Sequence, residues 1–201
     1  MFTQIHRTDR AARMTSAILT SEKLWEFAVR TYSTLGVSDA CLTLQNRYGA
    51  DVNMLLYCCW ISDRLGAFPP ELFTRATEFS SEWVSNTVVP LRSARTWMKD
   101  ADFAAESVPT EDCMRVRQEI KTVELESEKI QLQVLESMVT SKQTPDSGQE
   151  RIIGDAVINL KLYISNRDIG FDEDVKHLCE VVIAAAFPNC DAESVTEALR
   201  N

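Results

Sequence analysis

Apolar residues recur at helical spacing in nearly every segment of this chain after residue 20, and no segment shows sustained alternation of apolar and polar residues between hairpin turns. The strongest case is the run Val52–Leu65, which is apolar on nearly all sides. A helix that is hydrophobic all round belongs in the middle of a core. The pattern therefore predicts an all-α fold, a single-domain bundle of about seven to nine helices.

Capping residues and prolines indicate where helices start and stop. Thr20 or Ser21 is expected to cap the first helix. Pro70 suits the first position of a helix, because a proline there loses no hydrogen bond. Pro90 cannot continue a regular helix without strain, so a kink or a new helix start is expected near Val89. The polar, mildly basic residues 1–19 lack periodicity and are expected to form a mobile tail before one helical domain over residues 20–201.

The longest predicted helix covers residues 111–141, which contain no Gly or Pro. About 30 residues at 1.5 Å each make a rod of roughly 45 Å. A heptad-like stripe runs along it, with Ser127 at the missing position: Val116, Ile120, Val123, Ile130 and Val134. The stripe fits a helix packed along the first half of the same chain, or the seam of a homodimer. The polar gap favours the first interpretation.

The charge and composition of the chain limit the functions and cellular locations that it can have. The chain has 30 acidic against 21 basic residues, a net charge of -9, which argues against nucleic-acid binding because phosphates need a basic surface. No apolar stretch approaches the roughly 18 residues of a membrane span, and the N-terminus lacks the apolar core of a secretory signal. We therefore expect no membrane insertion and a cytoplasmic location, where the six cysteines stay reduced and buried or inert.

Catalytic patterns are scarce. The chain has two histidines, no Gly-x-Ser-x-Gly elbow, no glycine-rich phosphate loop and no zinc-type pair of spaced cysteines. The sequence therefore predicts no catalytic residue, no metal site and no cofactor. This favours a protein that is not an enzyme, without excluding one.

A first polar group surrounds the start of the most hydrophobic helix. It is a candidate ligand-binding site made of Gln45, Arg47, Asp51, Asn53 and Trp60. Asp51 is explained equally well as a helix cap, and the neighbouring amides could brace the turn. The structural explanation is favoured, and a small-molecule pocket is the alternative.

A second group is a basic stripe. Arg92, Arg95 and Lys99 step by three and four residues onto one helical face, beside Trp97. In an acidic protein such a stripe is a candidate partner-binding surface. A solvated face paired with nearby acidic residues is the commoner outcome.

The first half of the chain carries several specific motifs. They are LWxFA from Leu24, CLxLQ from Cys41 and GADVNxLLxCxW from Gly49. These motifs resemble an uncharacterised family of small, mostly proteobacterial, cytoplasmic proteins described as conserved hypothetical. The resemblance covers residues 20–100 strongly and residues 110–201 loosely. It implies a bacterial origin and an all-helical fold, and it carries over no activity or catalytic residue.

The leading hypothesis is a non-catalytic helical interaction protein of the bacterial cytoplasm. It would bind an unknown protein partner through the surface from Arg92 to Lys99 or through the long helix, which could also form a homodimer over residues 111–141. The alternative is a helical bundle, or an enzyme, with a small-molecule pocket near Gln45, Asn53 and Trp60.

Overall fold

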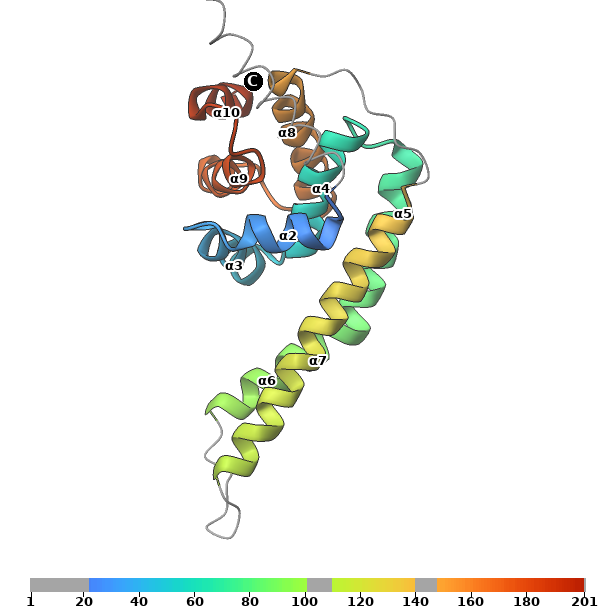
Figure 1. Ribbon diagram of the computed structural model, residues 1–201, viewed down its shortest axis with the longest axis vertical. Helices are drawn as coiled ribbons and strands as arrows, with labels where there is room; N and C mark the ends of the chain where they lie inside the picture. The colour runs from blue at the N-terminus through green and yellow to red at the C-terminus, as the bar shows by residue number, and fades with distance from the viewer. Residues whose placement is uncertain (1–21, 101–109, 140–147, 201) are drawn as a thin grey trace, which may run out of the picture. The chain divides into compact units, whose positions relative to one another are not determined.

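The computed structural model describes residues 22–100, 110–139 and 148–200, and within these ranges every regular element is a helix (Figure 1). The all-α prediction is confirmed. The tail predicted at residues 1–19 lies outside the described residues. Contacts group the chain into two compact units, of which unit 1 comprises Met1–Pro69 and Val139–Asn201 and unit 2 comprises Pro70–Met138.

Unit 1 is built around one buried helix, α4. Its helices are α2 (Leu24–Tyr32), α3 (Val37–Tyr48), α4 (Val52–Arg64), α8 (Gln149–Asn166), α9 (Glu173–Ala186) and α10 (Ala192–Arg200). Helix α4 contacts α2, α3, α8 and α9, and its side chains from Asn53 to Ser62 are all buried. The run that is apolar on all sides therefore forms the centre of a core, as its pattern predicts.

The sequence predicts an N-cap for α2 and for α4, and the structure confirms the one for α4. Asp51 caps α4, because its Oδ1 accepts the Asn53 N–H at 3.0 Å. The predicted caps Thr20 and Ser21 lie outside the described residues, and the N-cap of α2 (Leu24–Tyr32) is Lys23. There the Glu26 carboxylate reaches back to accept the Lys23 N–H at 3.4 Å, so an acidic residue inside the first turn satisfies the helix start.

A single buried amide joins α8 to the end of α4. The Asn159 side chain has no exposed surface, and its Nδ2 donates to the Cys58 carbonyl at 3.2 Å and the Gly66 carbonyl at 3.1 Å. Its Oδ1 accepts the Phe68 N–H at 2.8 Å. All three bonds are made to backbone groups of α4 and of the turn that follows it. Asn159 thereby fixes the path of the chain after α4.

Two glycines with positive φ allow a matched test of this turn. Gly66 (φ 85°) follows α4, and a Cβ there would lie 3.1 Å from Asp155 Oδ2 and 3.2 Å from Arg151 Nη1. Gly49 (φ 74°) follows α3, and no described atom comes within 4 Å of its would-be Cβ. We expect Gly49→Ala to lower the free energy of unfolding by about 1 kcal/mol, from backbone strain alone, and Gly66→Ala by about 2 to 3 kcal/mol.

Urea titration followed by far-UV circular dichroism measures both changes. Equal losses for the two variants would show that the side chains of Arg151 and Asp155 move aside at no cost.

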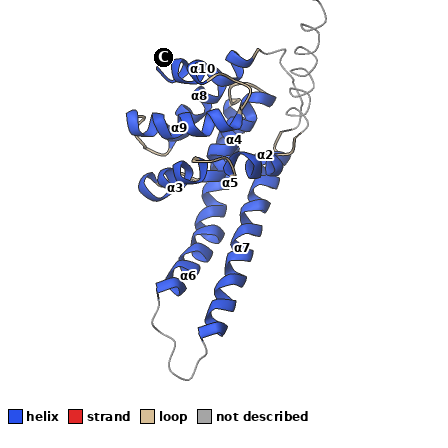
Figure 2. Ribbon diagram, turned by 60° about the vertical axis from the view of Figure 1, so that its left-hand side comes forward, coloured by secondary structure: helices blue, strands red, loops and turns tan. Residues whose placement is uncertain are grey.

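Unit 2 is an antiparallel helical hairpin (Figure 2). One arm is α5 (Pro70–Trp83), a π-helical turn η1 (Val84–Val88) and α6 (Val89–Asp100), continuous along the chain. The other arm is α7 (Thr110–Ser137), whose 28 residues confirm the predicted long helix. It packs against residues 70–100, in agreement with the favoured interpretation that this helix lies along the first half of the chain.

The interruption predicted near Val89 takes the form of the π-turn. The Val89 N–H donates to the Val84 carbonyl, one residue further back than in an α-helix. The turn comes directly before Pro90, which has no N–H to donate and whose ring crowds the preceding turn. The wider turn lets the helix pass the proline without ending.

Candidate functional site

The polar group predicted near the start of α4 is distributed over separate local interactions. At the end of α3, Arg47 Nη1 lies 3.3 Å from Asp174 Oδ2 on α9, and its guanidinium lies over the Tyr48 ring. Gln45 donates from Nε2 to the Asn46 side chain at 3.3 Å. Both polar ends are thus engaged with neighbouring protein groups.

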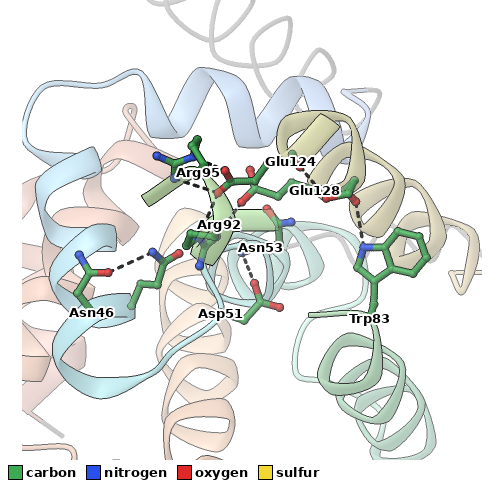
Figure 3. A network of polar contacts seen from close by, with 10 residues as sticks. Asn46, Asp51, Asn53, Trp83, Arg92, Arg95, Glu124 and Glu128 are labelled. Atoms are coloured by element: carbon green, nitrogen blue, oxygen red, sulfur yellow. Dashed lines mark hydrogen bonds and ion pairs between the residues drawn. The ribbon is translucent and has the colours of Figure 1, made fainter. Parts of the chain in front are cut away.

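Asp51 and Asn53 form the start of α4 together with α8. The Asp51 carboxylate caps the helix (Figure 3), and the Asp51 N–H donates to the Tyr163 hydroxyl at 2.7 Å. Burial, reinforced by the nearby Asp51 charge, raises the pKa of Tyr163 well above its ordinary value, so this hydroxyl stays neutral. The Asn53 side chain is 8 % exposed. These residues brace the helix start against α8.

Trp60 lies two turns further along α4, about 10 Å from Asn53 by helix rise. Its Nε1 donates to the Glu22 carbonyl at 3.1 Å, and the Arg64 guanidinium stands 4.7 Å from its ring centroid and donates to the same carbonyl. The neighbouring Asp63 has a raised pKa, because burial outweighs the opposing charge of Arg64. The structure therefore brings Asp51 and Asn53 together and places Trp60 at the other end of the helix. Binding of a ligand by this group stays a prediction.

The basic stripe is directed largely into unit 2. Arg92 Nε lies 3.1 Å from Glu124 Oε1 and its Nη2 lies 2.9 Å from Glu128, while Arg95 pairs with the other oxygen of Glu124 (Figure 3). Glu124 is 6 % exposed, so this is a largely buried carboxylate held by two guanidinium groups. Its pKa is lowered overall, because the hydrogen bonds and charges of Arg95 and Arg92 outweigh the burial that alone would raise it.

The remaining members of the stripe lie at the surface. Trp97 is 64 % exposed, and Lys99 is exposed as well. The sequence analysis expects the stripe to pair with nearby acidic residues, and the acidic partners that the structure gives for the two arginines are Glu124 and Glu128 on α7. Binding of a partner through Arg92, Arg95, Trp97 and Lys99 stays a prediction.

The pairing with Glu124 was missed in the sequence, although a signal for it exists. Glu124, Ser127 and Gln131 step by three and four residues, and all are buried. They bind across the hairpin, since the Ser127 carbonyl accepts the Trp83 Nε1–H at 3.0 Å and Gln131 Nε2 donates to the Ser80 hydroxyl. A polar row at helical spacing thus marks the inner face of α7.

Because this polar row occupies the inner face of α7, part of the predicted apolar stripe is exposed to solvent. We name Val116, Val123 and Ile130 the α7 apolar row; they are 38 %, 53 % and 43 % exposed and follow one another at intervals of seven residues. Such intervals keep side chains on one face of a helix. All three residues belong to the stripe that the sequence predicts.

Neither a metal centre nor a membrane span is found in the part of the chain that the structure describes. No group of three or more His, Cys, Asp or Glu side chains there is arranged to hold a metal ion. No helix in the described ranges combines the length and apolar character needed to cross a bilayer.

Four cysteines are fully buried in unit 1: Cys41, Cys58, Cys59 and Cys179. Burial raises the pKa of Cys41 and of Cys179 to about 12, so about one thiol in 10,000 is ionised at pH 8. We expect iodoacetamide at pH 8 to leave these four unmodified in the folded protein and to modify all six cysteines in guanidinium chloride, as measured by peptide mass spectrometry. Rapid labelling of Cys58 in the folded state would contradict this packing.

Comparisons with known proteins were made by family and by individual chain. Searches of curated proteins and of solved structures found no match. One family model, described as "Protein of unknown function (DUF2390)", matches residues 23–135, a range that includes the motifs starting at Leu24, Cys41 and Gly49 and all but the end of α7. Because the match covers more than half of the chain, the protein belongs to this DUF2390 family.

Proposed function

We propose that this protein is a non-catalytic helical interaction protein of the bacterial cytoplasm, and that it binds a partner polypeptide through the α7 apolar row. The observation that carries the proposal is the exposure of Val116, Val123 and Ile130 along one flank of a helix whose adjoining face is packed. Regularly spaced apolar side chains in water mark interaction sites more often than isolated ones do. Covering what remains exposed would contribute roughly 1 kcal/mol for each side chain.

The geometry of the hairpin supports the same function. Partly buried ion pairs and hydrogen bonds hold α7 against α5 and α6, so the row is presented on a preformed helix. A partner that adds a helix to such a surface uses apolar side chains at spacings of three, four and seven residues. Little ordering of the hairpin is needed when it binds, which favours affinity.

A small-molecule site has less support. Gln45, Arg47 and Trp60 each bond to a neighbouring group of the protein, and Trp60 lies two turns of α4 away from Asn53.

Site-specific photo-crosslinking in the native host tests the proposal. A benzoylphenylalanine at position 123 should crosslink to a defined peptide of one partner, identified by mass spectrometry. The same group at Gln118, about 140° around the helix, is the matched control. The purified partner should then bind Val123→Glu at least tenfold more weakly than the unmodified chain. Identical crosslinks from both positions, or unchanged affinity in the variant, would refute the proposal.

A further inference from the structure

A row of carboxylates accompanies the α7 apolar row. We name Asp112, Glu119 and Glu126 the acidic row; all three are exposed. Glu119 lies three residues after Val116 and four before Val123, and Glu126 has the same relation to Val123 and Ile130. Side chains three and four residues apart are neighbours on a helix surface. The exposed face of α7 therefore presents alternating apolar and anionic side chains.

The acidic row is only partly neutralised by the protein itself. Arg115 lies 3.8 Å from Asp112 and 2.8 Å from Glu119, in pairs whose side chains are about 60 % exposed. Such exposed pairs contribute little to stability and are readily exchanged for other partners. Glu126 makes no ion pair with any described residue. A cation brought by a partner would thus find carboxylates available beside the apolar row.

The same charges argue against a second copy of the chain as the occupant. In an antiparallel pairing of two α7 helices about Val123, Glu119 of one copy would lie within a turn of Glu126 of the other. A parallel pairing in register would place each of these carboxylates beside the same carboxylate of the other copy. Either arrangement buries negative charge without a counter-charge, which costs free energy.

We infer that the occupant of this face is a basic amphipathic helix, with apolar residues at spacings of three, four and seven and Lys or Arg beside them. The inference rests on the proposed function and names the chemistry of its partner. The row from Val116 to Ile130 spans about 21 Å, so a partner helix of roughly 15 to 18 residues covers it. Apolar contact supplies affinity, and the acidic row selects for positive charge and speeds association.

Fluorescence anisotropy with synthetic peptides tests the inference on the full chain. The probe is a fluorescein-labelled 18-residue peptide of Leu and Lys with helical apolar spacing, compared with peptides in which Glu or Gln replaces every Lys. The Lys peptide should bind at micromolar concentration, and the Glu peptide at least tenfold more weakly. Binding of the Lys peptide should weaken at least fivefold between 50 and 300 mM NaCl.

Variants assign the binding to this face. Charge reversal by Glu119→Lys with Glu126→Lys should weaken binding of the Lys peptide at least tenfold. The same reversal at Glu71 and Glu78 on α5, which are also exposed and seven residues apart, is the matched control and should change affinity less than twofold. Val123→Glu should weaken binding of the Gln peptide, and circular dichroism checks that every variant keeps its helix content.

The outcomes that overturn the inference are distinct from those that overturn the proposed function. Failure of the Lys peptide to bind at 100 μM protein, or equal binding of the Lys, Gln and Glu peptides, rejects the basic partner and leaves the apolar row as a docking site. If the control variant at Glu71 and Glu78 loses as much affinity for the Lys peptide as the variant at Glu119 and Glu126, the attraction is non-specific, and the inference is rejected as well. If sedimentation velocity at 10 μM shows a dimer of the unmodified chain and a monomer of Val123→Glu, the occupant of this face is a second copy of the chain, and the inference is rejected.

Discussion

Replacing Asn159 with leucine is expected to lower the free energy of unfolding by about 3 to 5 kcal/mol. The substitution keeps the branched shape and the number of non-hydrogen atoms of the side chain, but it leaves the Phe68 N–H and the Gly66 carbonyl without this partner and removes the second donor to the Cys58 carbonyl. Each unsatisfied buried backbone group costs about 1 to 3 kcal/mol, and a leucine cannot relieve any of them. Urea denaturation followed by far-UV circular dichroism measures the loss.

Asn166→Leu is the matched control, because Asn166 is the last residue of the same helix and is exposed. Its effect should stay within about 0.5 kcal/mol. A loss in Asn159→Leu no larger than in the control would mean that the chain after α4 rearranges to satisfy its own backbone groups.

Replacing Glu124 with glutamine is expected to lower the free energy of unfolding by about 2 to 3 kcal/mol at pH 7. The substitution removes the charge that Arg92 and Arg95 share while preserving the shape of the side chain. Glu119→Gln is the control, since Glu119 makes an exposed pair with Arg115 and its loss should cost less than about 0.5 kcal/mol. Urea denaturation at pH 7 measures both.

The effect of Glu124 should depend on pH with a definite sign. Its pKa in the folded protein is lowered below the ordinary value of about 4.3, because the arginine contacts outweigh burial. Its contribution is therefore complete above that ordinary value and is lost as the pH falls through the folded-state pKa. The difference in stability between the unmodified chain and Glu124→Gln should shrink as the pH is lowered from 6 to 3. A constant difference across that range would contradict the charge interaction.

Local features of the fold were predictable because they depend on neighbours in the sequence. Asp51 caps α4, Pro70 begins α5, and the run after Asp51 forms the buried centre of unit 1, all from short-range patterns. The N-cap at Lys23 was not predicted, because lysine is a poor cap by residue type and Glu26 provides the acceptor.

The long-range contacts could not be predicted, since side-chain spacing does not say which helices meet. Asn159 joins residues more than 90 positions away, and Glu124 meets arginines about 30 positions away. The division between residues 69 and 70 is also invisible to composition, because the prolines there suit a turn inside one domain as well as a boundary between two units. For the candidate site residues, the sequence predicts the position of each residue on its helix but not the group that its side chain contacts.

The π-turn at Val84–Val88 has a consequence for how this chain tolerates changes in length. In a regular α-helix, Ser80 and Arg92 would point about 120° apart, yet both meet α7. The π-turn absorbs one residue, which brings the two directions within about 20° of each other. The π-turn thus accommodates one extra residue in the helix. A related chain that is one residue shorter here would keep the contacts of Ser80 and Arg92 with α7 on a regular α-helix. Loss of two residues would rotate the arginines away from Glu124, so natural length variation at this point should be limited to one.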